Sequence, residues 1–78
     1  MTNLETYKQC FVEGLELDIN AVENASMESV DSWDSIGQMS LIALVEDAFN
    51  IELDPDEIMS FVDYNSGIQV LKNHNIEF

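Results

Sequence analysis

Residues 33–51 read WDSIGQMSLIALVEDAFNI and predict one long helix that begins at Asp34 or a neighbour and ends at Asn50. The helical period gathers one apolar set on a single side of this segment, with Ile42 at its edge: Leu41, Val45, Ala48 and Phe49. We expect that side to face the core. This is the clearest helical pattern in the chain, so the other elements are predicted around it.

The opposite side of the same helix carries a second apolar set. We call it the apolar strip, and it consists of Ile36, Met39 and Ala43, next to Ser40. The strip starts beside Ser35 and has Glu46 and Asp47 near its far end. A helix that is apolar all round often lies in a core, but a domain this small favours exposure of one side. Apolar anchors inside an acidic rim suit docking on a basic, partly apolar partner surface.

Capping residues and apolar spacing predict three more helices. Their expected bounds are Asn3–Glu13, capped by Thr2 and stopped by Gly14; Pro55–Ser60, capped by Asp54; and a last helix from Asn65 or Ser66 to Asn73. Residues 15–33 lack steady periodicity and predict a long loop with a helical turn near Asn20–Asn24. Six apolar residues are expected to pin this loop to the core: Leu15, Leu17, Ile19, Val22, Met27 and Val30. The predicted fold class is all-α, a small four-helix bundle of three main helices and one short helix, with a long first loop, in one domain over residues 1–78.

The charge of the chain is strongly one-sided. Sixteen Asp and Glu stand against two basic residues, Lys8 and Lys72, which gives a net charge of −14. Nucleic acids and anionic membranes are therefore not expected as partners, because they require basic side chains. Cationic patches on other proteins are favoured, unless the charge serves only to keep a monomer soluble. No signal-like start and no membrane-length apolar run is visible, so a cytoplasmic monomer without a membrane span is expected.

Ser35 lies where the amides of the predicted helix are unpaired and the helix dipole is positive, so a phosphate attached there would be favourably placed. The competing interpretation is that Ser35 or Asp34 merely caps the helix. Gly37 costs roughly 1 kcal/mol inside a helix relative to Ala. It indicates either an irregular first turn or a small residue that lets a partner or an attached group approach Ser35.

Beyond these patterns, the chain resembles acyl carrier proteins along nearly its whole length. Those proteins have a D-S-[L/I/M] motif at the start of the second helix, then an apolar series, then L-E-x-x-F or similar, and a short I-x-[L/V/I] segment. The residues in register here are Asp34, Ser35, Ile36, Leu41, Val45, Glu46, Phe49, Ile51 and Leu53. Pro55-Asp56-Glu57-Ile58 resembles the entry to the third helix of the family, and Ser66-Gly67-Ile68 the start of its fourth.

The resemblance implies a carrier that catalyses nothing itself. Ser35, flanked in the cofactor site by Asp34 and Ile36, would be the attachment point for 4′-phosphopantetheine, added from coenzyme A by a phosphopantetheinyl transferase with magnesium. The thiol of that arm would hold an acyl or aminoacyl group as a thioester. The residues that match the partner-recognition surface are Ile36, Met39, Ala43, Glu46 and Asp47. Implied partners are the transferase, an acyl-loading ligase or transferase, and synthase or ketosynthase-type enzymes of fatty-acid, polyketide or other specialised biosynthesis.

Two positions depart from the fatty-acid pattern, because Gly37 and Ser40 stand where those carriers usually have acidic residues. Glycine after D-S-x resembles D-alanyl carriers of cell-wall modification, and Trp33 before D-S resembles stand-alone carriers of polysaccharide and secondary-metabolite systems. A specialised carrier is favoured. The alternatives are a D-alanyl carrier and an acidic inhibitor or nucleic-acid mimic that blocks a basic surface. A hydrolase that uses Ser35 would need His74 as its base and is disfavoured.

The remaining candidate sites are weaker. A calcium-binding EF-hand loop that started at Asp31 would have its last ligand at Ile42, which has no oxygen in its side chain, so no calcium site is predicted there. Asp31-Ser32 is a second D-S pair, but the residues that follow it do not match the acyl carrier pattern. Cys10 is expected to be a small core residue, and His74 is alone, so no metal site is predicted. Four further side chains are most simply packing residues: Met27, Met39, Met59 and Tyr64.

Overall fold

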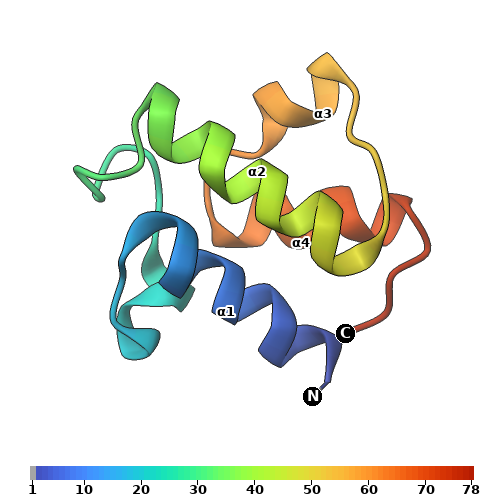
Figure 1. The fold of residues 1–78 in the computed structure, drawn as a ribbon, viewed down its shortest axis with the longest axis horizontal. Helices are drawn as coiled ribbons and strands as arrows, with labels where there is room; N and C mark the ends of the chain where they lie inside the picture. Colours follow the sequence, from blue (N-terminus) through green and yellow to red (C-terminus); the bar gives the residue numbers. More distant parts are fainter. Residues whose placement is uncertain (1) are drawn as a thin grey trace.

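The computed structural model describes residues 2–78, which form helices and connecting loops (Figure 1). The elements in chain order are α1 (Asn3–Leu15), the 3-10 helix η1 (Ile19–Asn24), α2 (Ser35–Phe49), α3 (Pro55–Ser60) and α4 (Tyr64–Asn73). Residues 2–78 contain no strand, only one isolated antiparallel bridge between Ser26 and Asp63. The predicted all-α class is therefore confirmed. No helix in this part of the chain combines the length and apolar character needed to cross a bilayer.

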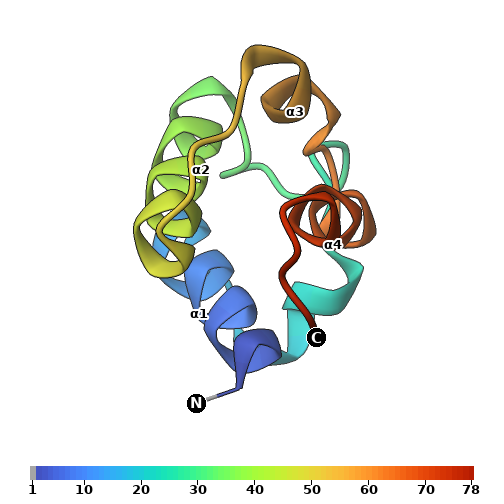
Figure 2. The same ribbon diagram turned by 90° about the vertical axis from the view of Figure 1, so that its right-hand side faces the viewer.

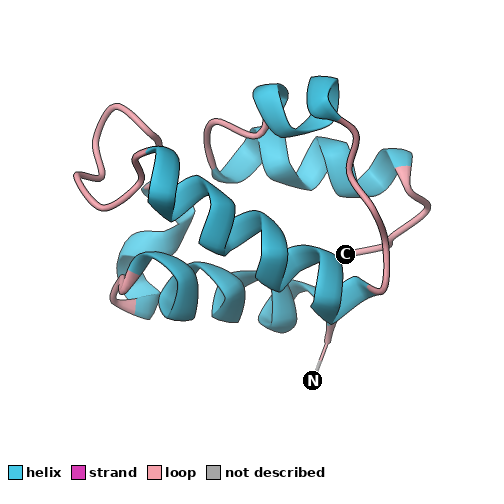
Figure 3. Cartoon of the chain, turned by 45° about the horizontal axis from the view of Figure 1, so that its top comes forward, coloured by secondary structure: helices cyan, strands magenta, loops and turns pink. Residues whose placement is uncertain are grey.

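The helices are arranged around a common interior. In the turned view of Figure 2, α1 and α2 form one side, α4 forms the other, and α3 joins them along one edge. Helix α1 packs against α2 and η1, while α4 packs against α3 and η1. Figure 3 shows the long connections on either side of α2, residues 25–34 before it and residues 50–54 after it. These connections lead directly into Ser35 and into Pro55, and so determine where α2 and α3 begin in space.

Side-chain caps fix the start of each α-helix. The capping residues are Thr2 for α1, Asp34 for α2, Asp54 for α3 and Asp63 for α4, and those of α1 and α3 form capping boxes. Helix α4 begins at Tyr64, one residue before the earlier of the two predicted starts, Asn65 and Ser66, because Asp63 provides the cap. Helix α2 ends as expected, with Asn50 in the left-handed conformation after its last turn.

The predicted stop of α1 at Gly14 is wrong. The helix continues to Leu15, and Glu16 takes the left-handed position that ends it, with φ of 55°. Gly14 instead lies directly against α2, since a Cβ at residue 14 would lie 3.2 Å from the Leu41 Cα. A small residue here lets the two helix backbones come together.

The buried face of α2 differs in part from the prediction. Leu41 and Val45 are fully buried and Ile42 is almost so, but Ala48 is exposed. The inward direction of the helix therefore points between Leu41 and Ile42 rather than along the line to Ala48. Phe49 is half-buried at the end of the helix.

Two of the six predicted loop anchors are wrong. Leu15 and Val22 are buried, and Leu17 and Val30 are half-buried, but Ile19 is 49% exposed and Met27 is 37% exposed. In η1 it is Val22 that turns inward. The Met27 amide donates a backbone hydrogen bond to the Val62 carbonyl at 2.9 Å, and the Met27 side chain faces out. Of the other predicted packing residues, Tyr64 is buried, whereas Met39 and Met59 are 74% and 76% exposed.

An aromatic cluster fills the centre of the molecule. Trp33, Tyr7, Phe11 and Phe61 are all essentially inaccessible to solvent. Phe11 meets Trp33 edge to face, with 5.4 Å between the ring centroids, and meets Tyr7 in the same way at 5.0 Å. The Tyr7 hydroxyl donates to the Tyr64 carbonyl at 2.6 Å, and burial raises the pKa of Tyr7 well above its usual value. Trp33, the residue just before Asp34, therefore anchors the end of the long loop in this cluster.

The cap of α4 makes a pH-dependent contribution to stability. The Asp63 Oδ1 accepts hydrogen bonds from the Ser66 amide and hydroxyl, both at 2.7 Å, and the backbone bond, then the hydroxyl, lowers the pKa of Asp63. A carboxyl whose pKa is lowered on folding stabilises the native state above its unfolded-state pKa of about 3.9, and this contribution disappears as the pH falls through the lowered value.

We therefore expect Asp63→Asn to be less stable than the wild type near neutral pH, and the difference to vanish toward about pH 2. Urea unfolding followed by Trp33 fluorescence measures the free energy of unfolding of the variant and of the wild type at each pH. Asp47→Asn removes the same charge from an exposed side chain and corrects for the general effect of net charge. A difference that stays constant across this pH range would contradict the prediction.

Candidate functional site

Ser35 is the first residue of α2, and it is not the cap. The Asp34 Oδ1 accepts the Gly37 amide at 2.9 Å, and the Asp34 carbonyl accepts the Gln38 amide at 2.8 Å. The Ser35 side chain is exposed, and its hydroxyl makes no hydrogen bond to any atom of residues 2–78. The capping interpretation therefore applies to Asp34 and leaves the Ser35 hydroxyl available.

The start of α2 suits an anionic group on that hydroxyl. In residues 2–78 the amides of Ser35 and Ile36 donate to no acceptor, as expected for the first turn of a helix. They lie at the positive end of the dipole of a 15-residue helix. A phosphate ester on the Ser35 Oγ would therefore lie beside unpaired donors and a favourable field.

The neighbouring D-S pair does not offer a second site of this kind. The Ser32 hydroxyl donates to the Leu15 carbonyl at 2.7 Å and so ties the loop to the end of α1. Ser32 has a structural hydrogen bond, whereas Ser35 has none.

Gly37 fits neither of the two sequence interpretations. Helix α2 is regular from Ser35 onward, and Gly37 is buried against the loop rather than turned toward the surface. A Cβ at this position would overlap the Ser32 carbonyl oxygen and lie 3.0 Å from a Leu15 methyl carbon. The glycine therefore allows the loop to close over the first turn of α2, and it is not part of the exposed apolar strip.

The apolar strip is exposed, as the helical period predicted. Ile36 and Met39 are 76% and 74% exposed, and Ala43 and Asp47 are also at the surface. Glu46 is different, because it is half-buried and its Oε2 accepts the Leu53 amide at 2.8 Å. Four of the five predicted partner-binding residues thus share an open surface, and the fifth is bonded to the connector that leads into α3.

Sequence reasoning missed Gln38. Its Oε1 accepts the Trp33 indole N–H at 2.6 Å, and its Nε2 donates to the Ile58 and Phe61 carbonyls at 2.9 and 3.0 Å. One side chain thereby links the loop before Ser35, the helix after it, and the end of α3. The available signal was a glutamine on the inner side of an otherwise apolar helix, where a polar group needs partners.

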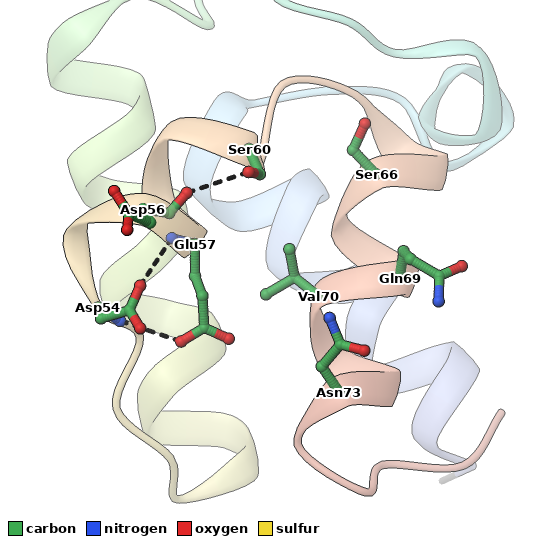
Figure 4. Close-up of a pocket in the computed structure, with 8 residues that line it drawn as sticks. All are labelled: Asp54, Asp56, Glu57, Ser60, Ser66, Gln69, Val70 and Asn73. Carbon is green, nitrogen blue, oxygen red and sulfur yellow. Dashed lines mark hydrogen bonds between the residues drawn. The ribbon is translucent and has the colours of Figure 1, made fainter.

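A cleft of about 440 Å³ lies between α3 and α4 (Figure 4). Its lining residues are Asp54, Asp56, Glu57, Ser60, Ser66, Gln69, Val70 and Asn73. Four of these polar residues already have structural hydrogen bonds: Asp54 and Glu57 form the capping box, the Ser60 hydroxyl donates to the Asp56 carbonyl at 3.0 Å, and the Ser66 hydroxyl donates to Asp63 at 2.7 Å. Across residues 2–78, no group of three or more His, Cys, Asp and Glu is arranged to hold a metal ion.

His74 and Cys10 are both engaged elsewhere. The His74 Nε2 lies 2.6 Å from the Glu57 Oε2, which joins the end of α4 to α3 rather than to Ser35. Cys10 is 4% exposed on the inner side of α1, and burial raises the pKa of its thiol to about 11. A buried thiol that stays protonated is a core residue, as the helical spacing predicted.

The chain was compared with protein-family models, with curated protein sequences and with solved structures. None of these comparisons found a match.

Proposed function

We propose that this chain is a carrier whose Ser35 hydroxyl accepts 4′-phosphopantetheine from coenzyme A. The observation that carries the proposal is the division of roles at the start of α2. Asp34 caps the helix, and the adjacent Ser35 hydroxyl is exposed without a hydrogen-bond partner in residues 2–78. The register of residues 34–68 with the acyl carrier pattern supports it independently.

The residues present fit that group. The Ser35 oxygen would form a bond to the phosphorus that carries the pantetheine arm, while the pyrophosphate bond of coenzyme A breaks and adenosine 3′,5′-bisphosphate leaves. The Ser35 proton would pass to a base of the transferase, since His74, the one histidine of the chain, pairs with Glu57. The unpaired amides of Ser35 and Ile36 would face the phosphate. When bound, the arm supplies a terminal thiol that holds an acyl or aminoacyl group as a thioester.

The surroundings of Ser35 suit delivery of cargo to other proteins. The apolar strip begins at the next residue, and the chain has a net charge of −14. Apolar anchors on an acidic domain favour partners with basic, partly apolar surfaces, such as a transferase, a loading ligase and synthase-type enzymes. As part of this proposal, the carrier and these partners work in the cytoplasm. The four α-helices are proposed to form the four-helix bundle of a carrier domain.

Loading with coenzyme A and a broad-range phosphopantetheinyl transferase tests the proposal directly. Intact-protein mass spectrometry should show the wild type gaining one phosphopantetheinyl group and Ser35→Ala gaining none. Ser32→Ala is the matched control: it removes the hydroxyl of the other D-S pair and should still be loaded. No gain with several transferases, or a gain in Ser35→Ala, would overturn the proposal. Tight binding of a basic protein that survives Ser35→Ala would favour the inhibitor alternative instead.

A further inference from the structure

Two side chains separate Ser35 from the interior of the molecule, and the first of them is Gln38. It lies one turn after Ser35 on α2, so the two residues are neighbours on the helix surface. The Gln38 Nε2 donates to the carbonyls of Ile58 and Phe61, at 2.9 and 3.0 Å. This amide therefore forms a bridge from the start of α2 to the end of α3.

The second side chain is the indole of Trp33, on the inner side of this bridge. Its N–H donates to the Gln38 Oε1 at 2.6 Å, and the residue is buried. The indole meets Phe11 and Phe61 with 5.4 and 6.5 Å between the ring centroids. Aromatic rings whose centroids lie about 4.5–7 Å apart are in direct contact. An alkyl chain can therefore pass between these rings only if they move.

The aromatic cluster continues further into the interior. Tyr7 contacts Phe11 and Phe61, with 5.0 and 6.3 Å between the ring centroids, and all three residues are fully buried. Adding methylene groups to an interior packed in this way destabilises a protein, because side chains and backbone must shift to make room. A chain that entered beside Ser35 would have to break the hydrogen bonds of Gln38 and then displace these rings.

The surface around α3 gives an alkyl chain little shelter from water. In the cleft between α3 and α4, seven of the eight lining residues are polar, and Val70 is the exception. A shallow groove of about 250 Å³ between α2 and α3 is more apolar, but Met39 and Ala43 in its lining are exposed. A chain in either place would stay in contact with water.

We propose that Trp33 and Gln38 close the interior of this carrier to its own cargo, so that the cargo is a short or polar acyl or aminoacyl group and not a long alkyl chain. Burial of an apolar chain is favoured by about fourfold in the equilibrium constant for each methylene group. A carrier with a closed interior leaves a long chain in water without this gain, whereas a short or polar group loses little. The inference rests on the proposed function and adds the class of cargo.

An alkyl chain tethered at residue 35 tests the closure without any transferase. Ser35→Cys puts a thiol at an exposed position, whereas Cys10 is buried and the pKa of its thiol is raised to about 11. Alkyl methanethiosulfonates should therefore react at residue 35 alone. The new thiolate forms a disulfide with the alkylthio group, and methanesulfinate leaves. Intact-protein mass spectrometry confirms a single addition.

The measurement is the melting temperature (Tm) of Ser35→Cys with an octyl label and with a methyl label. We expect the two values to agree within about 2 °C, because the longer chain stays in water. Burial of only two methylene groups would raise Tm by about 6 °C or more in a domain of this size. Such a rise would overturn the closure if the Trp33 emission also changes, and the limit on cargo if it does not.

Trp33→Leu in the Ser35→Cys background tests whether Trp33 is the closing residue. Leucine is smaller and lacks the N–H that Gln38 accepts, so it leaves room on the inner side of the bridge. The octyl label should now raise Tm by about 6 °C or more over the methyl label. Val22→Ala, which makes space at a buried position of η1, is the matched control and should show no such difference.

Each variant serves as its own reference, because the two labels are compared on the same sequence. A Trp33→Leu variant that folds but shows no difference between the labels would overturn the role of Trp33. If Trp33→Leu does not fold, the comparison of labels on Ser35→Cys alone still decides the closure.

Loading of Ser35 from octanoyl-coenzyme A and from acetyl-coenzyme A extends the test to the cargo itself. The two loaded forms should again agree in Tm within about 2 °C. An octanoyl form more stable by about 6 °C or more would leave the carrier proposal standing and overturn the limit on its cargo. If no transferase loads the chain, the carrier proposal and the class of cargo fall together, while the tethered chain still reports whether the interior is closed.

Discussion

A Trp33→Ala variant is expected to lose about 3–5 kcal/mol of its free energy of unfolding. Trp33 is 1% exposed and lies between Phe11 and Phe61, with ring centroids 5.4 and 6.5 Å away. Truncation opens a cavity in the aromatic cluster and leaves the Gln38 Oε1 without its indole donor. Folded proteins of this kind have roughly 0.05–0.15 kcal/mol of stability per residue. For 78 residues, the loss is a large part of the total.

Urea unfolding of Trp33→Ala followed by far-UV circular dichroism gives the comparison, since the variant lacks the only tryptophan. Trp33→Phe is the matched control, because it keeps an aromatic ring in the cluster and removes only the indole N–H and part of the volume. It should cost clearly less than the alanine variant. An unchanged unfolding midpoint for Trp33→Ala would show that the cluster does not stabilise the domain.

The elements that local chemistry specifies were predicted well from the sequence. Asp34 and Asp54 cap helices that begin one residue later, and Pro55 occupies the first helical position of α3, where its missing amide costs nothing. Capping and apolar periodicity involve residues within one or two turns of each other. Both signals can therefore be recognised in the sequence itself, and they were sufficient to predict the bounds of α2 and α3.

What the sequence could not supply depends on contacts between distant segments. Within residues 15–33, Trp33 turns into the core while Ile19 and Met27 turn out, and no periodicity distinguishes them. At the site, exposure of Ser35 followed from the helix faces, but the roles of Gln38 and Glu46 did not. The carbonyls that Gln38 binds lie 20 and 23 residues further along the chain, and only tertiary structure brings them there.

Gly37→Ala is expected to destabilise the domain, although the same change in an exposed helix would stabilise it by about 1 kcal/mol. The new Cβ would overlap the Ser32 carbonyl and press on Leu15 at 3.0 Å. Overpacking of this kind costs about 1–3 kcal/mol, and backbone atoms cannot rotate away as a side chain can. The steric cost should therefore exceed the gain in helix propensity, for a net loss of about 1–2 kcal/mol.

Gly37→Ala should also disturb the surroundings of Ser35, because relief of the overlap must move either Ser32 or the first turn of α2. Asp34 lies between them and holds the Gly37 amide at 2.9 Å, so its cap would be strained and the loading of Ser35 slowed. Ser40→Ala is the control: it adds helix propensity at an exposed position of α2 and should slightly stabilise the domain while loading proceeds as in the wild type. If Gly37→Ala is as stable as Ser40→Ala, the loop does not close on this glycine as tightly as the Ser32 contact requires.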